Sequence, residues 1–410
     1  MVRRSLFTLA AATTFGACGG TDSVTAPKLP TRPSAATSLA LGTQFTCALT
    51  DAAKPYCWGN DLSGQLGDSS FAQKLVPTPT AGGHSYILIA AGVSTACALD
   101  QAGAVWCWGD DPTQPGVPVS VQTVPTAVRA DRPLVSLTVG RKFACGLDGD
   151  GNAYCWGENG KGQLGVGDTL PHSSPVRVAG GQRFSQITAG FWHACAVGSS
   201  GAAYCWGDNL FGELGTGDTI GSSSPKRVSG PATFRSLGAG SVHACGVDMS
   251  GAALCWGGNF SGQLGDGTGQ RRLVPTAVAG GLAFASIRSS RANNLWGTTC
   301  GTTLGGDLYC WGWNSKNQLG NPSAADQCTP FQAPGTINNL VPTFVCSYEP
   351  LKASGISSVA TMDVGLEHTC ALSTSKELLC WGDNAHGELG DATGVPQTAP
   401  VVVKGSLRFP

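Results

Sequence analysis

Charged residues are scarce in this sequence: Asp, Glu, Lys and Arg make up 12% of it, and the formal net charge is −1. Binding the phosphate backbone of a nucleic acid requires many Lys and Arg contacts on a basic face. We therefore predict no nucleic-acid partner. Long apolar runs are lacking too, because the N-terminal run from Leu6 to Ala12 is too short to span a bilayer.

Motifs for catalysis and for cofactor binding are also missing. The sequence contains no Gly-x-Ser-x-Gly elbow, no His-Glu-x-x-His pair and no phosphate-binding loop. We predict no catalytic residue, no cofactor and no metal. His193, His243 and His368 occupy a repeated position that holds Phe45 or Thr95 in other repeats, which does not suit a ring of metal ligands. The segment 148–152 has the first half of a calcium loop but lacks the expected glutamate, so calcium stays an alternative there.

What the sequence has is a repeated cysteine pair. Seven times a cysteine is followed ten residues later by another, and each second cysteine begins Cys-Trp-Gly. Turn residues between the two, flanked by short apolar runs, indicate a β-hairpin that places the cysteines opposite each other, within disulfide reach. Free thiols in the core, or zinc, are the alternatives. The predicted disulfides are Cys47–Cys57, Cys97–Cys107, Cys145–Cys155, Cys195–Cys205, Cys245–Cys255, Cys300–Cys310 and Cys370–Cys380.

The repeat has a period of 50 residues. In one period the sequence predicts strands at 184–189, 193–197, 203–206 and 225–228, with a long loop before the last. We expect an all-β fold, a seven-bladed β-propeller of four-stranded antiparallel blades. The tryptophan of each Cys-Trp-Gly is predicted to lie buried between blades. The tail from Pro400 to Phe409 matches Pro175 to Phe184, and the strand that should follow occurs at 38–42, so the two ends close the ring.

These residues carry a family resemblance. Trp156-Gly157-Glu158-Asn159-Gly160-Lys161-Gly162-Gln163-Leu164-Gly165 and its counterparts resemble the regulator of chromosome condensation type repeat, as does Ala189-Gly190-Phe191-Trp192-His193-Ala194-Cys195. The resemblance covers about residues 38–409. It implies a seven-bladed propeller, which is also the fold of a secreted bacterial β-lactamase inhibitor protein. It implies much less about function, because fold and activity separate freely.

The N-terminus indicates a compartment. Arg3-Arg4, a short apolar core and small residues before Cys18 resemble a bacterial lipoprotein signal, in which that cysteine is lipidated. We expect a signal peptide at 1–17, lipidated Cys18 with a flexible tether at 18–37, and the propeller at 38–410. An ordinary secretory peptide is the alternative. The expected location is the extracytoplasmic side of a bacterial envelope, with membrane attachment through the lipid.

The number of cysteines and their predicted pairing are consistent with export. The 17 cysteines are Cys18, the fourteen of the hairpins, and Cys328 and Cys346, which we predict to form an eighth disulfide.

The sixth repeat departs furthest from the pattern. Its third-to-fourth loop runs 39 residues from Trp311 to Pro350 rather than 19, which we assign to an insertion at 321–349, and five residues are added around 291–296. If first-to-second and third-to-fourth connections share one face, both departures lie on it. Insertions on a rigid scaffold commonly bind partners, although a decorative loop is the alternative. The candidate partner-binding residues are Trp296, Trp313, Phe331, Phe344 and Tyr348.

The resulting hypothesis is an exported, lipid-anchored monomer that binds a protein partner through its loop-rich face. Inhibition of an extracytoplasmic enzyme is one form of this hypothesis. Guanine-nucleotide exchange, the activity of the best-known relatives, is an alternative that an oxidised, exported protein disfavours, because it would not meet a cytosolic GTPase. An enzyme would need an acid–base pair in the central channel.

Overall fold

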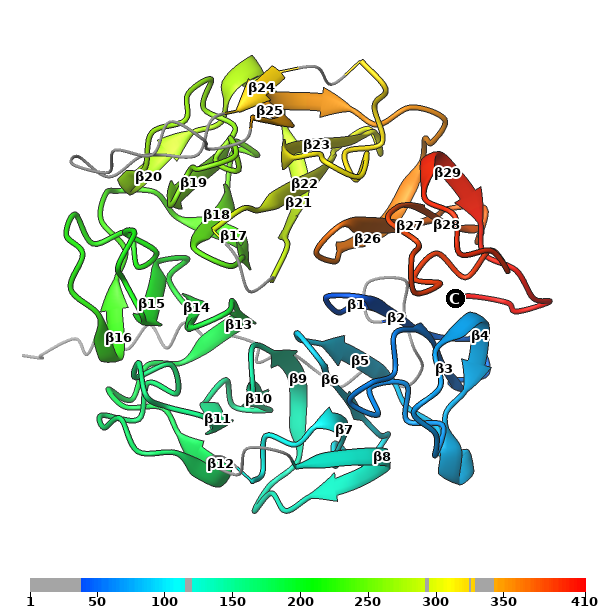
Figure 1. Cartoon of the computed structure of the whole chain (residues 1–410). Coiled ribbons are helices and arrows are strands. Elements are labelled where there is room, and N and C mark those ends of the chain that lie inside the picture. The colour runs from blue at the N-terminus through cyan, green and yellow to red at the C-terminus, as the bar shows by residue number, and fades with distance from the viewer. Residues whose placement is uncertain (1–37, 115–119, 292–294, 324–325, 329–342) are drawn as a thin grey trace, which may run out of the picture.

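A computed structural model describes residues 38–114, 120–291, 295–323, 326–328 and 343–410. Within these ranges the strands form seven antiparallel sheets. Figure 1 shows the sheets arranged as blades around a central axis. The chain is therefore an all-β, seven-bladed propeller, as its repeats predict.

The first four blades follow the chain in order. Blade one contains β1 (Leu39–Leu41), β2 (Phe45–Leu49), β3 (Pro55–Gly59) and β4 (Lys74–Pro79). Blade two contains β5 (Leu88–Ala91), β6 (Thr95–Leu99), β7 (Val105–Asp110) and β8 (Val121–Val128). Blade three contains β9 (Leu134–Val139), β10 (Phe143–Asp148), β11 (Ala153–Gly157) and β12 (His172–Arg177). Blade four contains β13 (Phe184–Ala189), β14 (His193–Gly198), β15 (Ala203–Gly207) and β16 (Ser222–Arg227).

The remaining blades include the irregular sixth one. Blade five contains β17 (Phe234–Ala239), β18 (His243–Asp248), β19 (Ala253–Gly257) and β20 (Arg272–Ala277). Blade six has the strand order β21 (Phe284–Ser289), β22 (Thr298–Thr303), β23 (Leu308–Trp313), β25 (Phe344–Lys352) and β24 (Asp326–Cys328). Blade seven contains β26 (Val359–Val364), β27 (His368–Ser373), β28 (Leu378–Gly382) and β29 (Gln397–Val402). Two 3₁₀ turns, η2 (Ala81–Gly83) and η3 (Ala279–Gly281), follow the fourth strands of blades one and five.

The hairpin register agrees with the sequence pattern. In blade three, Cys145 pairs with Cys155 across β10 and β11, and the other hairpins pair their cysteines in the same way. The fourth strands differ from the prediction, because β16 begins at Ser222 rather than Pro225 and a register shift separates its two ladder segments. A bulge of this kind is not visible in a pattern of apolar residues.

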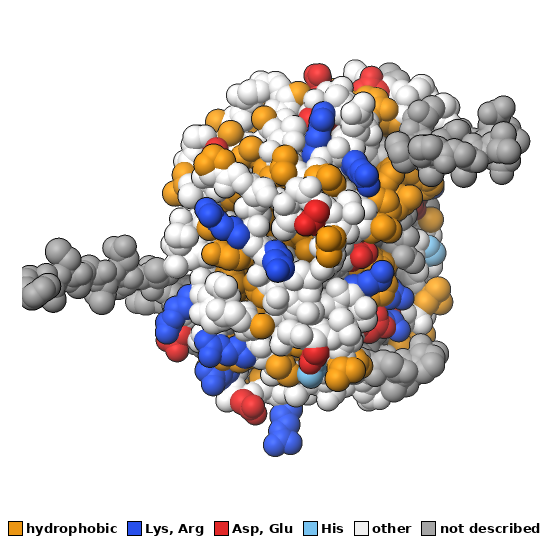
Figure 2. All heavy atoms as spheres, turned by 90° about the vertical axis from the view of Figure 1, so that its left-hand side faces the viewer, with side chains coloured by type: hydrophobic (Ala, Val, Ile, Leu, Met, Phe, Trp, Pro, Cys, Tyr) orange, Lys and Arg blue, Asp and Glu red, His pale blue; other side chains and the backbone are white. Residues whose placement is uncertain are grey.

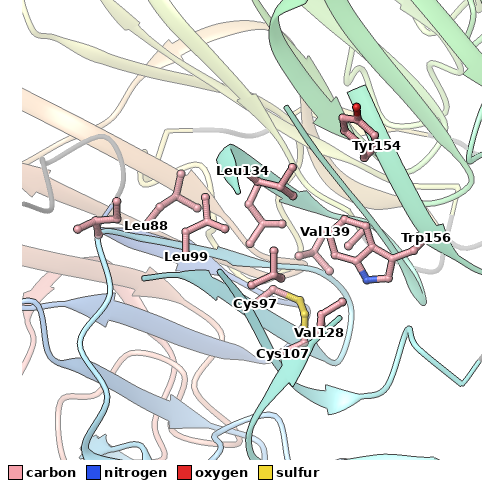
Figure 3. Packing of buried hydrophobic residues seen from close by; sticks show 13 residues of the cluster. Leu88, Cys97, Leu99, Cys107, Val128, Leu134, Val139, Tyr154 and Trp156 are labelled. Atoms are coloured by element: carbon pink, nitrogen blue, oxygen red, sulfur yellow. A yellow bond between two sulfur atoms is a disulfide. The ribbon is translucent and has the colours of Figure 1, made fainter. Parts of the chain in front are cut away.

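The core consists of separate clusters between neighbouring blades. Figure 3 shows one of them, in which Leu88, Leu99 and the Cys97–Cys107 bridge of blade two pack with Leu134, Val139 and Trp156 of blade three. The tryptophan of every Cys-Trp-Gly is fully buried, as predicted. The blades are therefore held together face to face by apolar contacts, with the indole as the largest group.

The ring closes where the two ends of the described chain meet. Figure 1 shows the C-terminus beside blade one, next to blade seven. The backbone N–H of Asp51 donates to the carbonyl of Arg408 (2.9 Å), and Phe409 is buried in a cluster with Leu39 and Trp58. The tail thus completes the packing of blade one, although each sheet is built from one continuous segment.

Candidate functional site

Three of the candidate residues on blade six form one aromatic cluster. The ring of Trp296 lies 5.3 Å from the ring of Trp313 and 5.4 Å from that of Phe344, measured between centroids. Trp296 comes from the β21–β22 connection, Trp313 ends β23, and Phe344 begins β25. Trp313 is buried, whereas Trp296 and Phe344 are partly exposed. We call these three residues the blade-six cluster.

Backbone hydrogen bonds fix the blade-six cluster in place. The N–H of Trp313 donates to the carbonyl of Gly297 (2.9 Å), and the Thr298 hydroxyl donates to the carbonyl of Trp313 (2.9 Å). The N–H of Asn314 donates to the carbonyl of Val345 (2.9 Å). The two insertions of blade six are therefore joined to each other through the end of β23.

Blade five supports the same segment from the other side. The Gln263 side-chain amide donates to the carbonyl of Leu295 (2.9 Å), and the N–H of Gly297 donates to the Ser261 hydroxyl (3.1 Å). Ser261 and Gln263 belong to the third-to-fourth loop of their blade, between β19 and β20. These contacts place the first-to-second and third-to-fourth connections on one face, which we call the loop-rich face.

The insertion is partly a hairpin. β24 pairs with β25, with Asp326 opposite Cys346 and Cys328 opposite Phe344, and a disulfide joins Cys328 to Cys346. The fourth strand of blade six accordingly begins at Phe344, six residues before the proline from which the sequence pattern counts. The inserted chain therefore adds its own strand pairing to the sheet of blade six.

Tyr348 does not join the blade-six cluster. Tyr348 packs against blade five, where its carbonyl accepts the N–H of Gly267 (3.0 Å). Burial raises the pKa of the Tyr348 phenol, and the charge of Asp326 raises it further. Phe331 lies outside the described residues.

Exposed apolar side chains on the loop-rich face are a feature that the sequence reasoning missed. Leu295, next to Trp296, is 44% exposed. Third-to-fourth loops of the other blades add Leu62, Phe71, Leu170, Leu210, Ile220 and Val395, all exposed. The signal was present, because Leu170, Ile220 and Val395 each stand fourteen residues after the tryptophan of their repeat. Such residues leave apolar area available for a partner.

A pocket opens on the same face between blades four and five. Phe211, Phe260, Asn259 and Arg271 line a cavity of about 480 Å³, and the two phenylalanine rings meet edge to face with centroids 5.0 Å apart. Gly269 also lines it, and a Cβ there would lie 3.2 Å from the Tyr348 ring. The pocket therefore borders Tyr348, at the edge of the blade-six insertion.

The recurring histidines have a packing role. His193, His243 and His368 are buried, and burial lowers the pKa of His193 to about 4 and those of the other two to about 3. Each ring lies over a glycine at the end of the preceding strand, as Phe45 lies over Gly42 in blade one. Among the described residues, no group of three or more His, Cys, Asp or Glu could hold a metal ion.

The Asp148 turn does not have the form of a calcium loop. One Asp148 carboxylate oxygen accepts the N–H groups of Asp150 and Asn152 (2.9 Å each). The carboxylate also forms an ion pair with Arg132. These partners account for Asp148 as part of the hairpin turn.

The structure contains the seven hairpin disulfides, with Cα atoms 4.0 to 4.1 Å apart, in addition to Cys328–Cys346. All sixteen of these cysteines are buried. Cys18 lies outside the described residues, as do the expected signal peptide and tether. No helix within the described ranges is long and apolar enough to cross a membrane.

Charges are mixed on the side of the molecule that carries blades four and five. Figure 2 shows Lys and Arg there interspersed with Asp and Glu among uncharged and apolar side chains. No basic surface of the kind that holds a phosphate backbone is visible on this side.

Seven antiparallel blades, six of four strands and one of five, each with a cysteine-paired central hairpin, define a disulfide-rich β-propeller. The chain belongs to the RCC1-like domain family, whose domain matches residues 6–346. The regulator of chromosome condensation (RCC1) repeat matches residues 357–388.

Relatives are similar over shorter segments or at low identity. The ultraviolet-B receptor UVR8 of Arabidopsis thaliana is 28% identical over 115 residues, which are 28% of this chain and 22% of the receptor. The probable E3 ubiquitin-protein ligase HERC4 of Homo sapiens is 35% identical over 74 residues, 17% of this chain and 7% of the ligase. The chain thus spans less than a quarter of either relative.

Solved structures share the fold over most of the chain. Prp20p of Saccharomyces cerevisiae superposes with a TM-score of 0.65 at 21% identity, covering 80% of both chains. Human WBSCR16 gives 0.70 at 18% identity, covering 86% of this chain and 95% of its own. At these identities the likeness shows the fold alone.

Proposed function

We propose that this protein is an exported, lipid-anchored interaction module that binds a protein partner through the loop-rich face of its propeller. The observation that carries the proposal is the blade-six cluster, in which two separate insertions bring Trp296 and Phe344 to the surface over a buried Trp313. Aromatic anchors near a well-packed centre commonly supply most of the binding energy of an interface.

The contacts that hold the blade-six cluster in place favour a binding role over a loop that binds nothing. A partner must overcome the entropy lost when loops and side chains become ordered, so a surface that is ordered in advance binds more tightly. That order comes from the Cys328–Cys346 bridge, from the Gln263 amide that donates to Leu295, and from the Ser261 hydroxyl that accepts the N–H of Gly297. Exposed Leu295 beside the cluster extends the apolar area.

Export is supported by the cysteines and by the lipoprotein-like N-terminus. A chain with sixteen cysteines in disulfide geometry suits an oxidising compartment. Non-reducing mass spectrometry of protein from its native envelope should find eight disulfides and an acylated Cys18. Several free hairpin thiols would rule out the oxidising compartment, and detergent-phase partitioning that survives Cys18→Ala would rule out the anchor.

Inhibition of an extracytoplasmic enzyme is one form of this proposal. Guanine-nucleotide exchange is the weaker alternative, although the solved structure of Prp20p is described together with its binding to Gsp1p and histones. Disulfides in every blade would separate the present chain from a cytosolic GTPase.

Paired variants on the loop-rich face test the binding surface. After crosslinking in native envelopes has identified a partner, Trp296→Ala and Phe344→Ala should each weaken binding at least about tenfold, because hot-spot aromatics typically contribute 2 kcal/mol or more. Met249→Ala removes an apolar side chain that is 63% exposed in the hairpin turn between β18 and β19, outside the loop-rich face, and it should leave affinity unchanged.

A second experiment on the binding surface shortens the insertion of blade six. The shortened loop must keep Ser347 to Lys352, because Ser347, Leu351 and Lys352 pair with β23. Loss of residues 324–345, combined with Cys346→Ser because the deletion removes the disulfide partner Cys328, should abolish partner capture while the midpoint of thermal unfolding stays nearly unchanged. Full affinity of both the shortened protein and Trp296→Ala would place the binding surface elsewhere on the ring.

A further inference from the structure

One position of the innermost strands carries charge in only two blades. The residue that pairs with the first hairpin cysteine is small and uncharged in five blades. These five residues are Ala40, Ala90, Thr138, Thr188 and Gly238. Blades six and seven have Arg288 and Asp363 instead. Opposite charges therefore occupy neighbouring blades where the rest of the ring is neutral.

The structural role of this position does not require a charge. The Thr138 hydroxyl accepts the N–H of Ala189 in the next blade (3.0 Å), and Thr188 accepts the N–H of Ala239 (3.4 Å). Asp363 does the same with one carboxylate oxygen, which accepts the N–H of Leu41 (2.9 Å). Asp363 is only 6% exposed. Its other oxygen, Oδ1, is buried and has no hydrogen-bond partner among the described residues.

Two guanidinium groups of blade six also have donors to spare. Nη1 of Arg288 donates to the carbonyl of its neighbour Ile287 (3.0 Å). Arg291 reaches from blade six to blade two, where its Nη1 donates to the carbonyl of Ala91 (2.8 Å), and its buried Nε has no partner among the described residues. Within those residues neither guanidinium forms an ion pair. Each arginine has five N–H donors and no acceptor.

These groups line one cavity in the centre of the ring. The cavity has a volume of about 120 Å³, and Arg288, Arg291 and Asp363 line it together with Thr138, Thr188 and Gln186. A single water needs roughly 10–15 Å³ of such space, so there is room for a small organic molecule. Two arginines and one aspartate give the lining a net charge of +1.

Burial also sets the electrostatics of the cavity. It lowers the pKa of the Arg288 guanidinium, while the charge of Asp363 raises that pKa and the charge of Arg291 lowers it. Like charges that lie close together and partly buried are costly unless an anion compensates them.

We propose that the central cavity binds a small 2-hydroxy carboxylate. The carboxylate accepts hydrogen bonds from the free N–H groups of Arg288 and Arg291, since the planar guanidinium matches a carboxylate in geometry and charge. The neighbouring hydroxyl donates to Oδ1 of Asp363. A monoanion neutralises the charge of the lining. The carboxylate and the hydroxyl of the ligand together satisfy the buried donors and the buried acceptor.

Titration calorimetry on the oxidised full-length protein, in a carboxylate-free buffer, tests this site. Glycolate should bind with saturable 1:1 stoichiometry. Acetate, which lacks the hydroxyl, should bind at least about fivefold more weakly, and ethylene glycol, which lacks the charge, should not bind. Chloride that competes as strongly as acetate would overturn the proposal in favour of a general anion site, and absence of saturable heat with either acid would overturn it altogether.

The repeats supply matched variants. Arg288→Thr and Asp363→Thr place at each position the residue that blades three and four already have. Arg288→Thr should weaken glycolate binding more than about tenfold, and Asp363→Thr should reduce the affinity for glycolate to that for acetate. Arg183→Gln changes an exposed arginine outside the cavity and should have no effect. Unchanged glycolate affinity in Arg288→Thr would overturn the assignment, and if that variant does not fold, the ligand comparison in the unmodified protein decides.

Discussion

At the scale of single residues, one loop position combines a fixed hydrogen bond with a variable charge. In six of the seven blades Gln or Glu stands seven residues after the blade tryptophan, whereas blade two has Pro115 there. The side-chain oxygen accepts the N–H two residues earlier, as in Lys161 to Gln163 (2.9 Å). Glu213 accepts from Phe211 (2.8 Å) and Glu388 from His386 (2.9 Å) in the same way. Burial raises the pKa of both glutamates to about 7. Below about pH 7, a protonated glutamate therefore takes the place of glutamine in these two blades.

Glu213→Gln should raise the free energy of unfolding at alkaline pH. A carboxyl whose pKa is raised in the folded state contributes stability that is fully present below its unfolded pKa of about 4.5 and is lost as the pH rises through about 7. Glutamine does not titrate, so the gain over the unmodified protein should be near zero at pH 5 and on the order of 1–3 kcal/mol at pH 9. Urea unfolding of both proteins at pH 5 and pH 9 measures this gain in the free energy of unfolding.

Glu377→Gln is the matched control, because Glu377 is exposed in the turn between β27 and β28. This change should alter the free energy of unfolding neither at pH 5 nor at pH 9. If Glu213→Gln and the unmodified protein lose stability in parallel from pH 5 to pH 9, Glu213 does not titrate as its burial indicates.

The Gln/Glu alternation can be read from the sequence, but the protonation cannot. Gln163, Glu213 and Glu388 occupy the same place in their repeats, so a shared structural role follows from the pattern. The pKa depends on how completely the packed loop excludes water from each carboxyl, and that is a property of the assembled ring. The cavity charges show the same limit, because Arg291 reaches Ala91 only when blades six and two face each other.

At the scale of elements, the blades are joined by a repeated indole hydrogen bond. The Trp206 indole N–H donates to the carbonyl of Gln163 in the preceding blade (3.0 Å), and Trp256 donates in the same way to Glu213 (2.8 Å). Trp108 and Trp156 are exceptions, because the indole nitrogen of each is buried without a partner among the described residues. Blade two, which precedes Trp156, has no Gly-Gln-Leu-Gly segment to supply the carbonyl, whereas blade one, which precedes Trp108, has this segment at 64–67.

Trp206→Phe should therefore destabilise the protein more than Trp156→Phe. Both changes remove the same atoms from a fully buried site, but only the first breaks a hydrogen bond and leaves a buried carbonyl unpaired. The difference in free energy of unfolding should be about 1–2 kcal/mol. Denaturant unfolding of the oxidised variants at one pH measures the difference, and equal losses would show that the indole bond adds nothing to blade association.

Elements that follow the repeat could be predicted, and elements that depart from it could not. The cysteine register across β10 and β11 follows from the ten-residue spacing, which is copied in every blade. β24 has no counterpart to copy, and its pairing with β25 displaces the start of the fourth strand to Phe344. The same pairing separates Tyr348 from Trp296, since the strand carries the tyrosine to the boundary with blade five.

At the scale of the whole molecule, closure of the ring depends on the last few residues. In blade four, Phe184 is buried and the carbonyl of Arg183 accepts the N–H of Ser199 (3.1 Å). The tail reproduces this arrangement for blade one with buried Phe409 and the bond from Asp51 to Arg408. Each described sheet is built from one continuous segment, so side-chain packing between blades seven and one, to which Phe409 contributes, closes the ring.

Phe409→Ala should open the ring at the contact between blades seven and one. Phe409 is 5% exposed, and removal of a buried phenylalanine side chain typically costs about 3–5 kcal/mol of the free energy of unfolding. Because the disulfides lie within blades, they cannot hold this junction closed. Hydrogen exchange should therefore accelerate most in β1 and β26, the innermost strands on either side of it, and Phe71→Ala should change neither stability nor exchange. Acceleration spread evenly over all seven blades would instead show that the ring opens at no preferred place and that the tail is not its closure.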